Sequence, residues 1–213
     1  MKQYFLSRFF CLCFFFSPLA AQEATVKQLP PPQTDIGKPL MQALKLRQST
    51  RSFETKALPV QEHSNLLWAA NGFNRPEAGK RTAPTAMNMQ EIDIYVVLEE
   101  GAYLFDAKKN ELHPVVSKDI RSAAGTQPFV KDAPLNLIYV ADYTKITRGS
   151  NEDKILCTGA DAGFIAQNVY LYCASQGLGV VVRASVDRAA LAKELQLRAE
   201  QKIVLAQTVG YGK

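Results

Sequence analysis

The sequence is poor in the side chains that most hydrolases and metalloenzymes use. Its 213 residues include only two histidines, His63 and His113. Neither has an obvious nucleophile or metal ligand beside it in the sequence, so we expect both at the surface. The motifs H-E-x-x-H, C-x-x-C, G-x-S-x-G and the phosphate-binding P-loop are all absent. These absences argue against a hydrolase and against a zinc enzyme, and we expect no metal site.

Two further classes of protein are disfavoured. No G-x-G-x-x-G is present, and the glycines of residues 177–180, "GLGV", follow a predicted helix rather than a strand, so a Rossmann dinucleotide site is excluded by context. The net charge of +5 is too small to indicate nucleic-acid binding, and no basic and aromatic face accompanies it. We therefore expect no nucleic-acid partner.

The first 21 residues differ from the rest. Lys2 and Arg8 precede the apolar run of residues 9–16, Pro18 breaks that run, and small residues end at Ala21. This pattern predicts a signal peptide that is cut near Ala21, export to the periplasm, and no stable membrane insertion after cleavage. An uncleaved anchor is the alternative. Cleavage would lower the net charge from +5 to +3.

Two of the four cysteines, Cys157 and Cys173, remain after cleavage. If one helix carries both, a rise of about 1.5 Å per residue places them roughly 24 Å apart. A disulfide needs Cα atoms within about 7 Å of one another. We therefore expect two buried, unpaired thiols.

Residues 22–37 are polar and contain three consecutive prolines, which predicts an extended leader before a domain of residues 38–213. Within that domain, hydrophobic periodicity predicts the regular elements. The predicted helices are 39–47, 59–70, a polar stretch at 116–124, 159–176, and one that begins at Ser185 or Asp187. The predicted strands are 92–98, 103–105, 135–141, 180–182 and 202–210, and residues 74–91 are predicted to be a long functional loop.

Two of these elements indicate a central layer. The run 135–141 is apolar throughout, as in a strand buried on both faces. The helix 159–176 is apolar on nearly all sides, which predicts a central, buried helix. Helices and strands mix without regular βαβ alternation, so the predicted fold class is α+β.

The remaining chemistry lies in three small polar clusters on different segments. Such clusters suit a protein that anchors a cofactor, because the cofactor then supplies the reactive atoms. Arginine and serine suit a phosphate, and amides suit a ring edge that both donates and accepts hydrogen bonds. The clusters are Arg47, Gln48, Ser49 and Arg51 in "RQSTRSF", then Pro84, Thr85, Asn88 and Gln90 in the long loop, and residues 181–185, "VVRAS".

These stretches, in this order, resemble the nitroreductase family of FMN-dependent oxidoreductases. "RQSTRSF" is similar to the family's R-x-S-x-R-x-F signature, and "APTAMNMQEIDIYVV" to its A-P-S-x-x-N-x-Q-P-W-x-F-x-V segment. "DAGFIAQNVYLYCASQGLG" resembles its central helix, "VVRASVDRAALAKELQL" the segment after that helix, and "AQTVGYGK" its closing strand. The resemblance spans residues 38–213.

The resemblance implies a nitroreductase-like fold, with a central, mostly antiparallel sheet flanked by helices and a long buried central helix. It implies a homodimer with FMN at the interface. The FMN phosphate and ribityl chain would be held by Arg47, Gln48, Ser49 and Arg51, with Lys213 as the last phosphate cation. Pro84, Thr85, Asn88 and Gln90 would lie at the ring system, and the backbone of Ala184 and Ser185 would approach flavin N5.

The implied activity is ping-pong hydride transfer at flavin N5, between a small-molecule donor and an acceptor such as a nitroaromatic compound or a quinone, without a catalytic side chain. The alternatives are a non-catalytic secreted flavin- or small-ligand-binding protein of this fold, and a flavin dehydrogenase that acts on a modified peptide or aromatic ring. The sequence departs from the family pattern at Glu91 and Ile92, which replace P-W, and at its end, Lys213, where relatives often continue.

Overall fold

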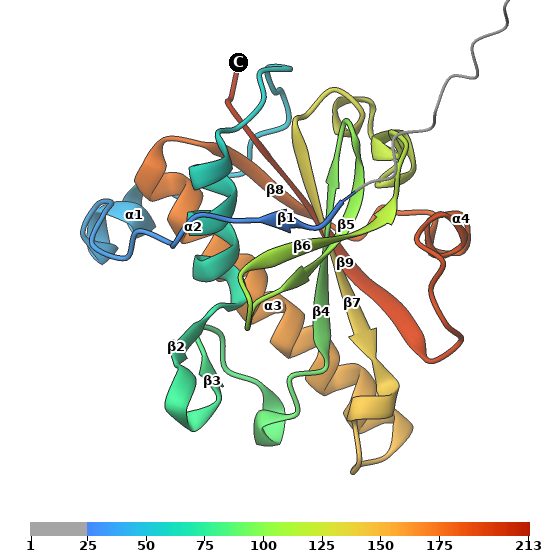
Figure 1. The fold of residues 1–213 in the computed structure, drawn as a ribbon. Coiled ribbons are helices and arrows are strands. Elements are labelled where there is room, and N and C mark those ends of the chain that lie inside the picture. Colours follow the sequence, from blue (N-terminus) through green and yellow to red (C-terminus); the bar gives the residue numbers. More distant parts are fainter. Residues whose placement is uncertain (1–24) are drawn as a thin grey trace, which may run out of the picture.

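The structure is a computed structural model that describes residues 25–213, so the predicted signal peptide and its cleavage near Ala21 lie outside the described residues. The described chain is α+β, as predicted: one seven-stranded sheet carries helices on both faces (Figure 1). All neighbouring strands in it are antiparallel. None of the described helices combines the length and the apolar character that a membrane span requires.

The sheet has the strand order β1-β6-β5-β4-β7-β9-β8, and β2 and β3 form a separate small hairpin. The strands are β1 (Lys27–Gln28), β2 (Phe73–Arg75), β3 (Lys80–Arg81), β4 (Ile92–Leu98), β5 (Gly101–Asp106), β6 (Glu111–Val116), β7 (Leu135–Asp142), β8 (Gly179–Arg183) and β9 (Gln201–Gly210). The α-helices are α1 (Leu40–Leu46), α2 (Val60–Asn71), α3 (Asn151–Gln176) and α4 (Arg188–Glu194).

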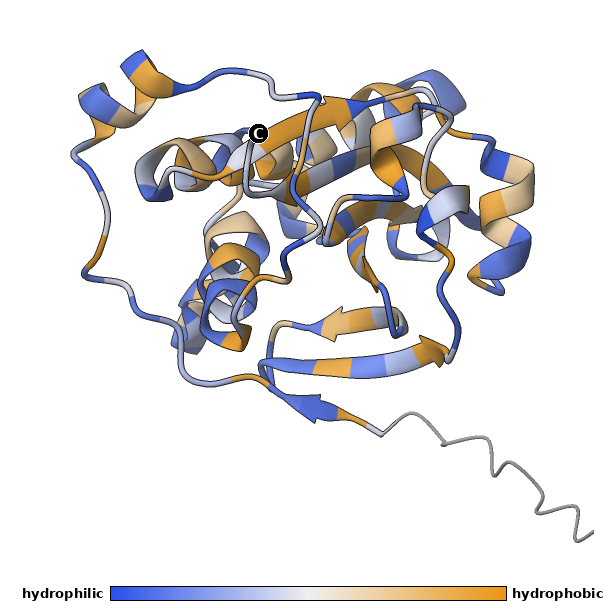
Figure 2. Cartoon of the chain, turned by 90° about the horizontal axis from the view of Figure 1, so that it is seen from above, coloured by the Kyte–Doolittle hydropathy of each residue, from blue (hydrophilic) through white to orange (hydrophobic). Residues whose placement is uncertain are grey.

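Strand β7 lies inside the sheet, between β4 and β9, and all eight of its residues are buried. On one face, Leu137 and Tyr139 belong to the core formed with α2 and α3. On the other face, Ile138 and Val140 pack in a second core that includes Leu191 of α4. The strand lacks polar alternation because both of its faces are covered, as its sequence predicted. Figure 2 shows the apolar residues concentrated in these central layers.

Helix α3 is the longest element, and it begins earlier than the predicted residue 159. Ser150 and Asp153 form a capping box at its start: each side chain accepts a hydrogen bond from the backbone N–H of the other residue. The helix ends at Gly177, whose φ of 75° is left-handed, as the predicted glycine stop requires. Cys157 and Cys173 both lie on it and are unpaired, as predicted, but only Cys173 is buried and Cys157 is half-buried.

The burial of α3 is one-sided. Ala162 and Val169 are fully buried against the sheet. In contrast, Ile155, Leu156 and Phe164 are exposed by 64%, 72% and 46%. The apolar character that predicted burial on nearly all sides therefore leaves an uncovered apolar face on the single chain.

The predicted polar helix at 116–124 is wrong. Val116 ends strand β6, and only a short 3-10 helix, Arg121–Ala123, follows. Sequence reasoning missed β6 because Pro114 interrupts it and cannot donate to a sheet ladder. The strand tolerates Pro114 because β1 pairs with β6 only at Glu111 and Leu112, so Pro114 lies where β6 forms the edge of the sheet.

Two irregular segments have more structure than their composition indicated. The loop 74–91 contains most of the β2–β3 hairpin and two 3-10 turns, Pro76–Ala78 and Ala86–Asn88. The leader is extended and pairs with β6 through β1. Its Leu29 is buried to 2% exposure, and the backbone N–H of Gln33 donates to Asn65 of α2 at 2.7 Å.

Two glycines of α3 offer a matched test of its C-terminal stop. A Cβ atom at Gly177 or at Gly159 would meet no atom within 4 Å, so substitution by alanine changes only backbone energetics. Gly177→Ala places a Cβ on a left-handed residue and should lower the free energy of unfolding by about 1–2 kcal/mol. Gly159→Ala removes a glycine from a helix interior and should raise it by about 0.5–1 kcal/mol. Urea unfolding measures both, and equal signs would contradict this account of the helix end.

Candidate functional site

The predicted phosphate segment runs from the end of α1 along β8. Arg47 caps α1 with extended dihedral angles, φ −56° and ψ 121°, and the chain then continues beside the strand. The backbone N–H of Thr50 donates to the carbonyl of Val180 at 2.9 Å. Phe53 is buried and bridges to Gly212, so the segment is held between β8 and the C-terminus.

Tyr170 of α3 organises one side of this segment. The guanidinium of Arg47 lies over its ring, 5.3 Å from the centroid. Its hydroxyl is 2.8 Å from Ser49 Oγ and accepts a hydrogen bond from the backbone N–H of Val182 at 3.0 Å. Tyr170 was missed by sequence reasoning, because a buried aromatic residue on an apolar helix gives no signal that distinguishes it from core.

Gln48 lies on the other side, because side chains alternate along an extended segment. It lines a cavity of about 390 Å³ together with Thr50, Lys213 and Lys38. Lys38, which the sequence analysis did not single out, donates its Nζ to the carbonyl of Ser175 at 2.7 Å. The four clamp residues predicted from "RQSTRSF" are therefore split between two sides. Arg51 is exposed and forms no hydrogen bond with any described residue.

The second predicted cluster forms a tight loop with an unusual backbone. Met87, Asn88 and Gln90 have positive φ angles of 51°, 58° and 50°, which non-glycine residues adopt only at a cost. Pro84 and Asn88 are exposed, and Thr85 is half-buried. Pro84, Thr85 and Asn88 line a cavity of about 340 Å³ that also borders Arg75, Lys80 and Arg81.

Gln90 is committed to the loop itself. Its Oε1 accepts from Arg81 Nε at 2.7 Å, and its Nε2 donates to the carbonyl of Gly79 at 2.6 Å and to Asn88 Oδ1 at 3.1 Å. Its amide therefore stabilises the loop and positions Asn88. Asn88 accepts this bond through Oδ1, which leaves the Nδ2 group of its exposed amide without a partner in the described chain.

A pair of buried acidic side chains ties this loop to α3. Glu91 is fully buried, and its Oε2 accepts from Thr85 Oγ1 at 3.1 Å. Asp161 is 3% exposed, and its Oδ2 accepts from the backbone N–H of Ala86 at 3.0 Å. Burial, together with the neighbouring charge of Asp161, raises the pKa of Glu91. Glu91 occupies the position where the family pattern has proline. The structure buries its side chain, and this burial favours the uncharged form of the carboxyl group.

The third cluster follows β8. Ala184 and Ser185 are exposed, and within the described residues neither backbone N–H donates a hydrogen bond. Arg183 immediately before them is 5% exposed, and burial lowers its pKa to about 10. Its guanidinium donates to Thr208 Oγ1, the Ala124 carbonyl and Asn136 Oδ1 at 2.9–3.1 Å. These three hydrogen bonds hold the end of β8 in place, beside two residues whose backbone N–H groups are unpaired in the described chain.

The structure thus joins the first and third clusters along β8 and keeps the second apart. Asp161, beside the 84–90 loop, and Tyr170, beside Ser49, are nine residues apart on α3, which corresponds to roughly 14 Å. Figure 1 shows the C-terminus and the loop that leads into β4 at opposite ends of the molecule. Within the described chain, neither of the two cavities is lined by residues of both groups.

The two histidines do not behave as expected. His63 on α2 is half-buried, and burial lowers its pKa to about 4, so it is neutral near pH 7. His113 on β6 does have close partners, because Glu111 and Asp106 lie 3.1 and 3.8 Å from its Nε2. The expectation of two plain surface histidines was wrong, because the burial of α2 and the pairing of β5 with β6 are tertiary features.

The raised pKa of Glu91 has a consequence for stability. A folded-state pKa above the unfolded value means that the carboxyl favours folding fully below about pH 4.5, and that this contribution is lost as the pH rises through the folded pKa. Gln cannot ionise, so Glu91→Gln should gain stability relative to the wild type as the pH rises from 4.5 to 8. Thermal unfolding at both pH values tests this, with the exposed Glu77→Gln as the control. A constant difference between the Glu91→Gln and wild-type melting temperatures would contradict it.

Comparisons with known proteins agree with this architecture. The model of the nitroreductase family matches residues 44–211. A Methanocaldococcus jannaschii protein, provisionally named a nitroreductase, is 32% identical over 145 residues, covering 63% of this chain and 73% of that protein. A solved structure from Ralstonia eutropha, also named provisionally, is 41% identical, with a TM-score of 0.84 and coverage of 88% of this chain and 90% of that one.

A more distant likeness shows only the fold. The Escherichia coli microcin synthetase complex has a chain that is 18% identical, with a TM-score of 0.71 and coverage of 97% of this chain and 85% of that chain. The family match spans most of the described residues, and the Ralstonia structure shares both sequence and fold over nearly the whole length. This chain therefore belongs to the nitroreductase family, a family of flavin-dependent oxidoreductases.

Proposed function

We propose that this protein binds FMN and transfers hydride by a ping-pong reaction to an acceptor such as a nitroaromatic compound or a quinone. The observation that carries the proposal is the layout along β8. At one end lies the segment of Arg47, Ser49 and Arg51, and at the other end lie the exposed residues Ala184 and Ser185, whose N–H groups make no hydrogen bond in the described chain. From Val180 to Ala184, a strand spans roughly 13 Å, which suits an elongated mononucleotide.

The phosphate end would be held by cations and one hydroxyl. The guanidinium forks of Arg47 and Arg51 match phosphate oxygens, and Arg51 is not engaged by any described residue. Tyr170 positions both Arg47 and Ser49. Gln48 and Lys213 line the cavity on the other side of this segment, so the proposed clamp consists of Arg47, Ser49 and Arg51.

The ring end would be held by neutral donors. Bound FMN would supply the redox chemistry, accepting and passing on a hydride at its N5 atom. The backbone N–H groups of Ala184 and Ser185 would donate to that edge of the ring, held in place by the buried guanidinium of Arg183. The amide of Asn88 suits the opposite edge, which both donates and accepts hydrogen bonds.

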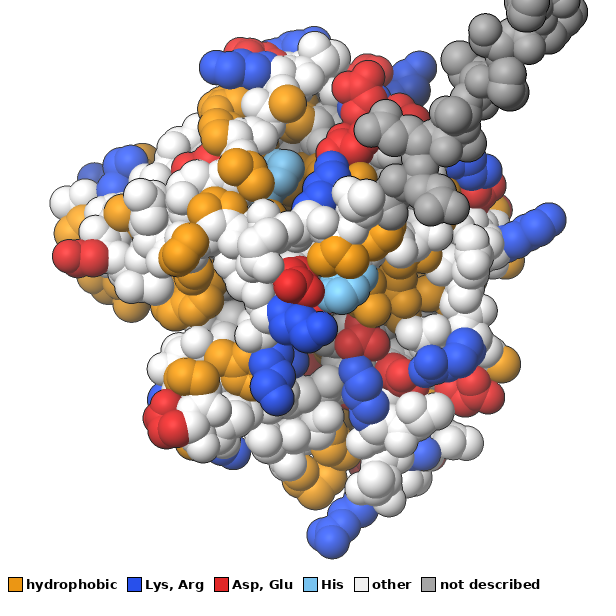
Figure 3. Space-filling view, viewed as in Figure 1, with side chains coloured by type: hydrophobic (Ala, Val, Ile, Leu, Met, Phe, Trp, Pro, Cys, Tyr) orange, Lys and Arg blue, Asp and Glu red, His pale blue; other side chains and the backbone are white. Residues whose placement is uncertain are grey.

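We further propose that a second copy completes this site, with the FMN at the interface. In one chain the loop around Asn88 lies apart from the β8 cluster, so a single protomer offers only half of a cradle. Apolar side chains also remain exposed on α1 and α3, among them Met41 at 75% and Leu156 at 72%. Figure 3 shows apolar side chains reaching the surface near α1. A dimer that buries these faces would bring the two kinds of cluster together.

Residues 1–21 support the proposal that the protein is exported. Nicotinamide cofactors are cytosolic, so the physiological hydride donor of an exported enzyme would be a different reductant. Fractionation and N-terminal sequencing test this: a periplasmic protein that begins at Gln22 supports export, and a cytosolic protein that keeps Lys2 and Arg8 overturns it.

The purified protein tests the cofactor and the reaction. It should absorb at about 450 nm, lose that absorbance with dithionite, and recover it with a quinone or nitroaromatic compound under anaerobic conditions. Its mass by light scattering should be that of two chains. A protein that is colourless and cannot be reconstituted with FMN would overturn the proposal. A yellow protein that no acceptor reoxidises would support the alternative of a flavin-binding protein without catalysis.

The phosphate clamp has its own test. Arg47→Ala combined with Arg51→Ala should weaken FMN binding by at least about a hundredfold, because two charge-assisted hydrogen bonds to phosphate contribute about 1.5–3 kcal/mol each. The double variant Lys131→Ala with Arg148→Ala removes the same charge from exposed positions and should bind FMN normally. Fluorescence titration with FMN measures both. If the clamp variant retains wild-type affinity, the assignment of Arg47 and Arg51 is wrong.

A further inference from the structure

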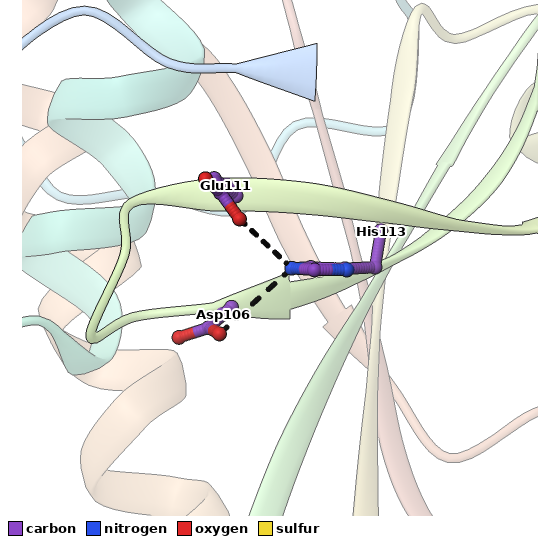
Figure 4. Close-up of side chains that lie close together, drawn as sticks. All are labelled: Asp106, Glu111 and His113. Atoms are coloured by element: carbon purple, nitrogen blue, oxygen red, sulfur yellow. Dashed lines mark ion pairs between the residues drawn. The ribbon is translucent and has the colours of Figure 1, made fainter. Parts of the chain in front are cut away.

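The hairpin of β5 and β6 places three potential metal ligands on one face. Asp106 pairs with Glu111 across the two strands, and Leu104 pairs with His113. Glu111 and His113 are two residues apart on β6, so their side chains point to the same side of the sheet. Figure 4 shows the imidazole of His113 directed between the two carboxylates.

The three ligand atoms lie at distances that a single small cation could span. The Nε2 atom of His113 is 3.1 Å from Glu111 Oε2 and 3.8 Å from Asp106 Oδ2, and the ligand atoms of all three residues lie within 4.8 Å of one another. Zinc bonds of about 2.0–2.1 Å place two tetrahedral ligands about 3.3 Å apart. The observed separations bracket that value.

The imidazole nitrogen lacks any other role. Nε2 of His113 is inaccessible to solvent, yet it makes no hydrogen bond to the described residues. A buried nitrogen that points at two carboxylates without a hydrogen bond would be satisfied by a cation between them. The three side chains retain 21–36% exposure, which leaves room for water as a further ligand.

The surrounding turn holds the carboxylate of Asp106 in place. Its Oδ1 accepts from the backbone N–H groups of Lys108 and Lys109 at 2.9 and 3.1 Å, which leaves Oδ2 directed at His113. Asn110 adopts a left-handed φ of 56°, and its side chain donates to the carbonyl of Pro30 at 2.8 Å. The ligand-bearing hairpin is therefore anchored to the leader rather than free.

We propose that Asp106, Glu111 and His113 bind a divalent transition-metal ion of the Zn²⁺ class. Imidazole nitrogen favours zinc and its neighbours over Mg²⁺ and Ca²⁺, which prefer oxygen ligands only. Two carboxylates balance the charge of the ion. The bound metal links β5 to β6 at the outer part of the sheet, where Pro114 weakens the ladder, so it would act as a clip for this hairpin.

The neighbouring cations do not occupy the site. Lys27 on the adjacent β1 pairs with Glu100 and lies over the ring of Tyr103. Arg81 interacts electrostatically with Asp106, but its guanidinium donates hydrogen bonds to Gln90 and to the carbonyl of Asn71 instead. Within the described chain, His113 is the only group that forms an ion pair with either carboxylate. The rival interpretation is therefore a protonated His113 paired with Glu111, without a metal.

Isothermal titration of the EDTA-treated protein with Zn²⁺ separates the two interpretations. We expect the wild type to bind one Zn²⁺ ion per chain, and we expect His113→Gln to weaken this binding strongly. Its affinity should fall by at least about a hundredfold, more than the 10- to 100-fold that loss of an outer-sphere partner costs. Asp106→Asn should weaken the same site. Because the chain has only two histidines, NMR can follow both rings, and Zn²⁺ should shift the signals of His113 and not those of His63.

His63→Gln is the matched control and should bind Zn²⁺ as the wild type does. Cysteine thiolates are competing ligands, and Co²⁺ distinguishes them, because sulfur ligands add a charge-transfer absorption that a site of nitrogen and oxygen lacks. If His113→Gln binds Zn²⁺ as tightly as the wild type, or if Zn²⁺ leaves the His113 signals unmoved, the proposal is overturned. Should His113→Gln fail to fold by circular dichroism, Asp106→Asn carries the same test.

Discussion

The structure depends on the burial of β7 from both sides. Its eight residues are all buried, with α3 covering one face of the sheet and α4 covering the other. Burial of apolar area, at about 25 cal/mol per Å², is the main favourable contribution to folding. Strand β7 buries apolar side chains on both faces of the sheet and therefore contributes to both cores. The remaining strands extend outward from this centre, and the polar clusters can lie at the ends of β8 and α3 because the interior is already filled.

The two cores also determine where functional groups can be placed. Tyr170 and Asp161 lie on the buried face of α3, and each forms a hydrogen bond with a different surface segment. Tyr170 bonds to Ser49, and Asp161 accepts from the backbone N–H of Ala86. The long helix thus acts as a rigid spacer between the β8 cluster and the loop before β4. In one chain this spacer keeps the two clusters apart, which is why we propose that the site is completed between two chains.

The agreement between sequence and structure follows the strength of the local signals. The run 135–141 and the stop at Gly177 are each set by consecutive residues, and each predicted the right feature. The phosphate-binding role of "RQSTRSF" stays a prediction. The failures occurred where distant residues decide. Strand β6 was missed because it contains Pro114, and a strand tolerates proline only where it forms the edge of a sheet, which the sequence does not reveal. The first turn of α3 is polar and is stabilised by the Ser150–Asp153 capping box rather than by periodicity.

The sequence by itself determined the four α-helices, the strands β4, β5, β7, β8 and β9, the fold class and the family, because hydrophobic periodicity and short motifs are local properties. Only the tertiary structure decided which polar residues meet. Gln48 lies on the side opposite to Arg47 because side chains alternate along an extended segment. Gln90 accepts a hydrogen bond from Arg81 and is therefore part of the loop itself. Asp106 and His113 lie close together because the hairpin pairs Asp106 with Glu111, which is two residues from His113 and on the same side of the sheet. Such contacts depend on strand register and helix packing, which no single stretch of sequence specifies.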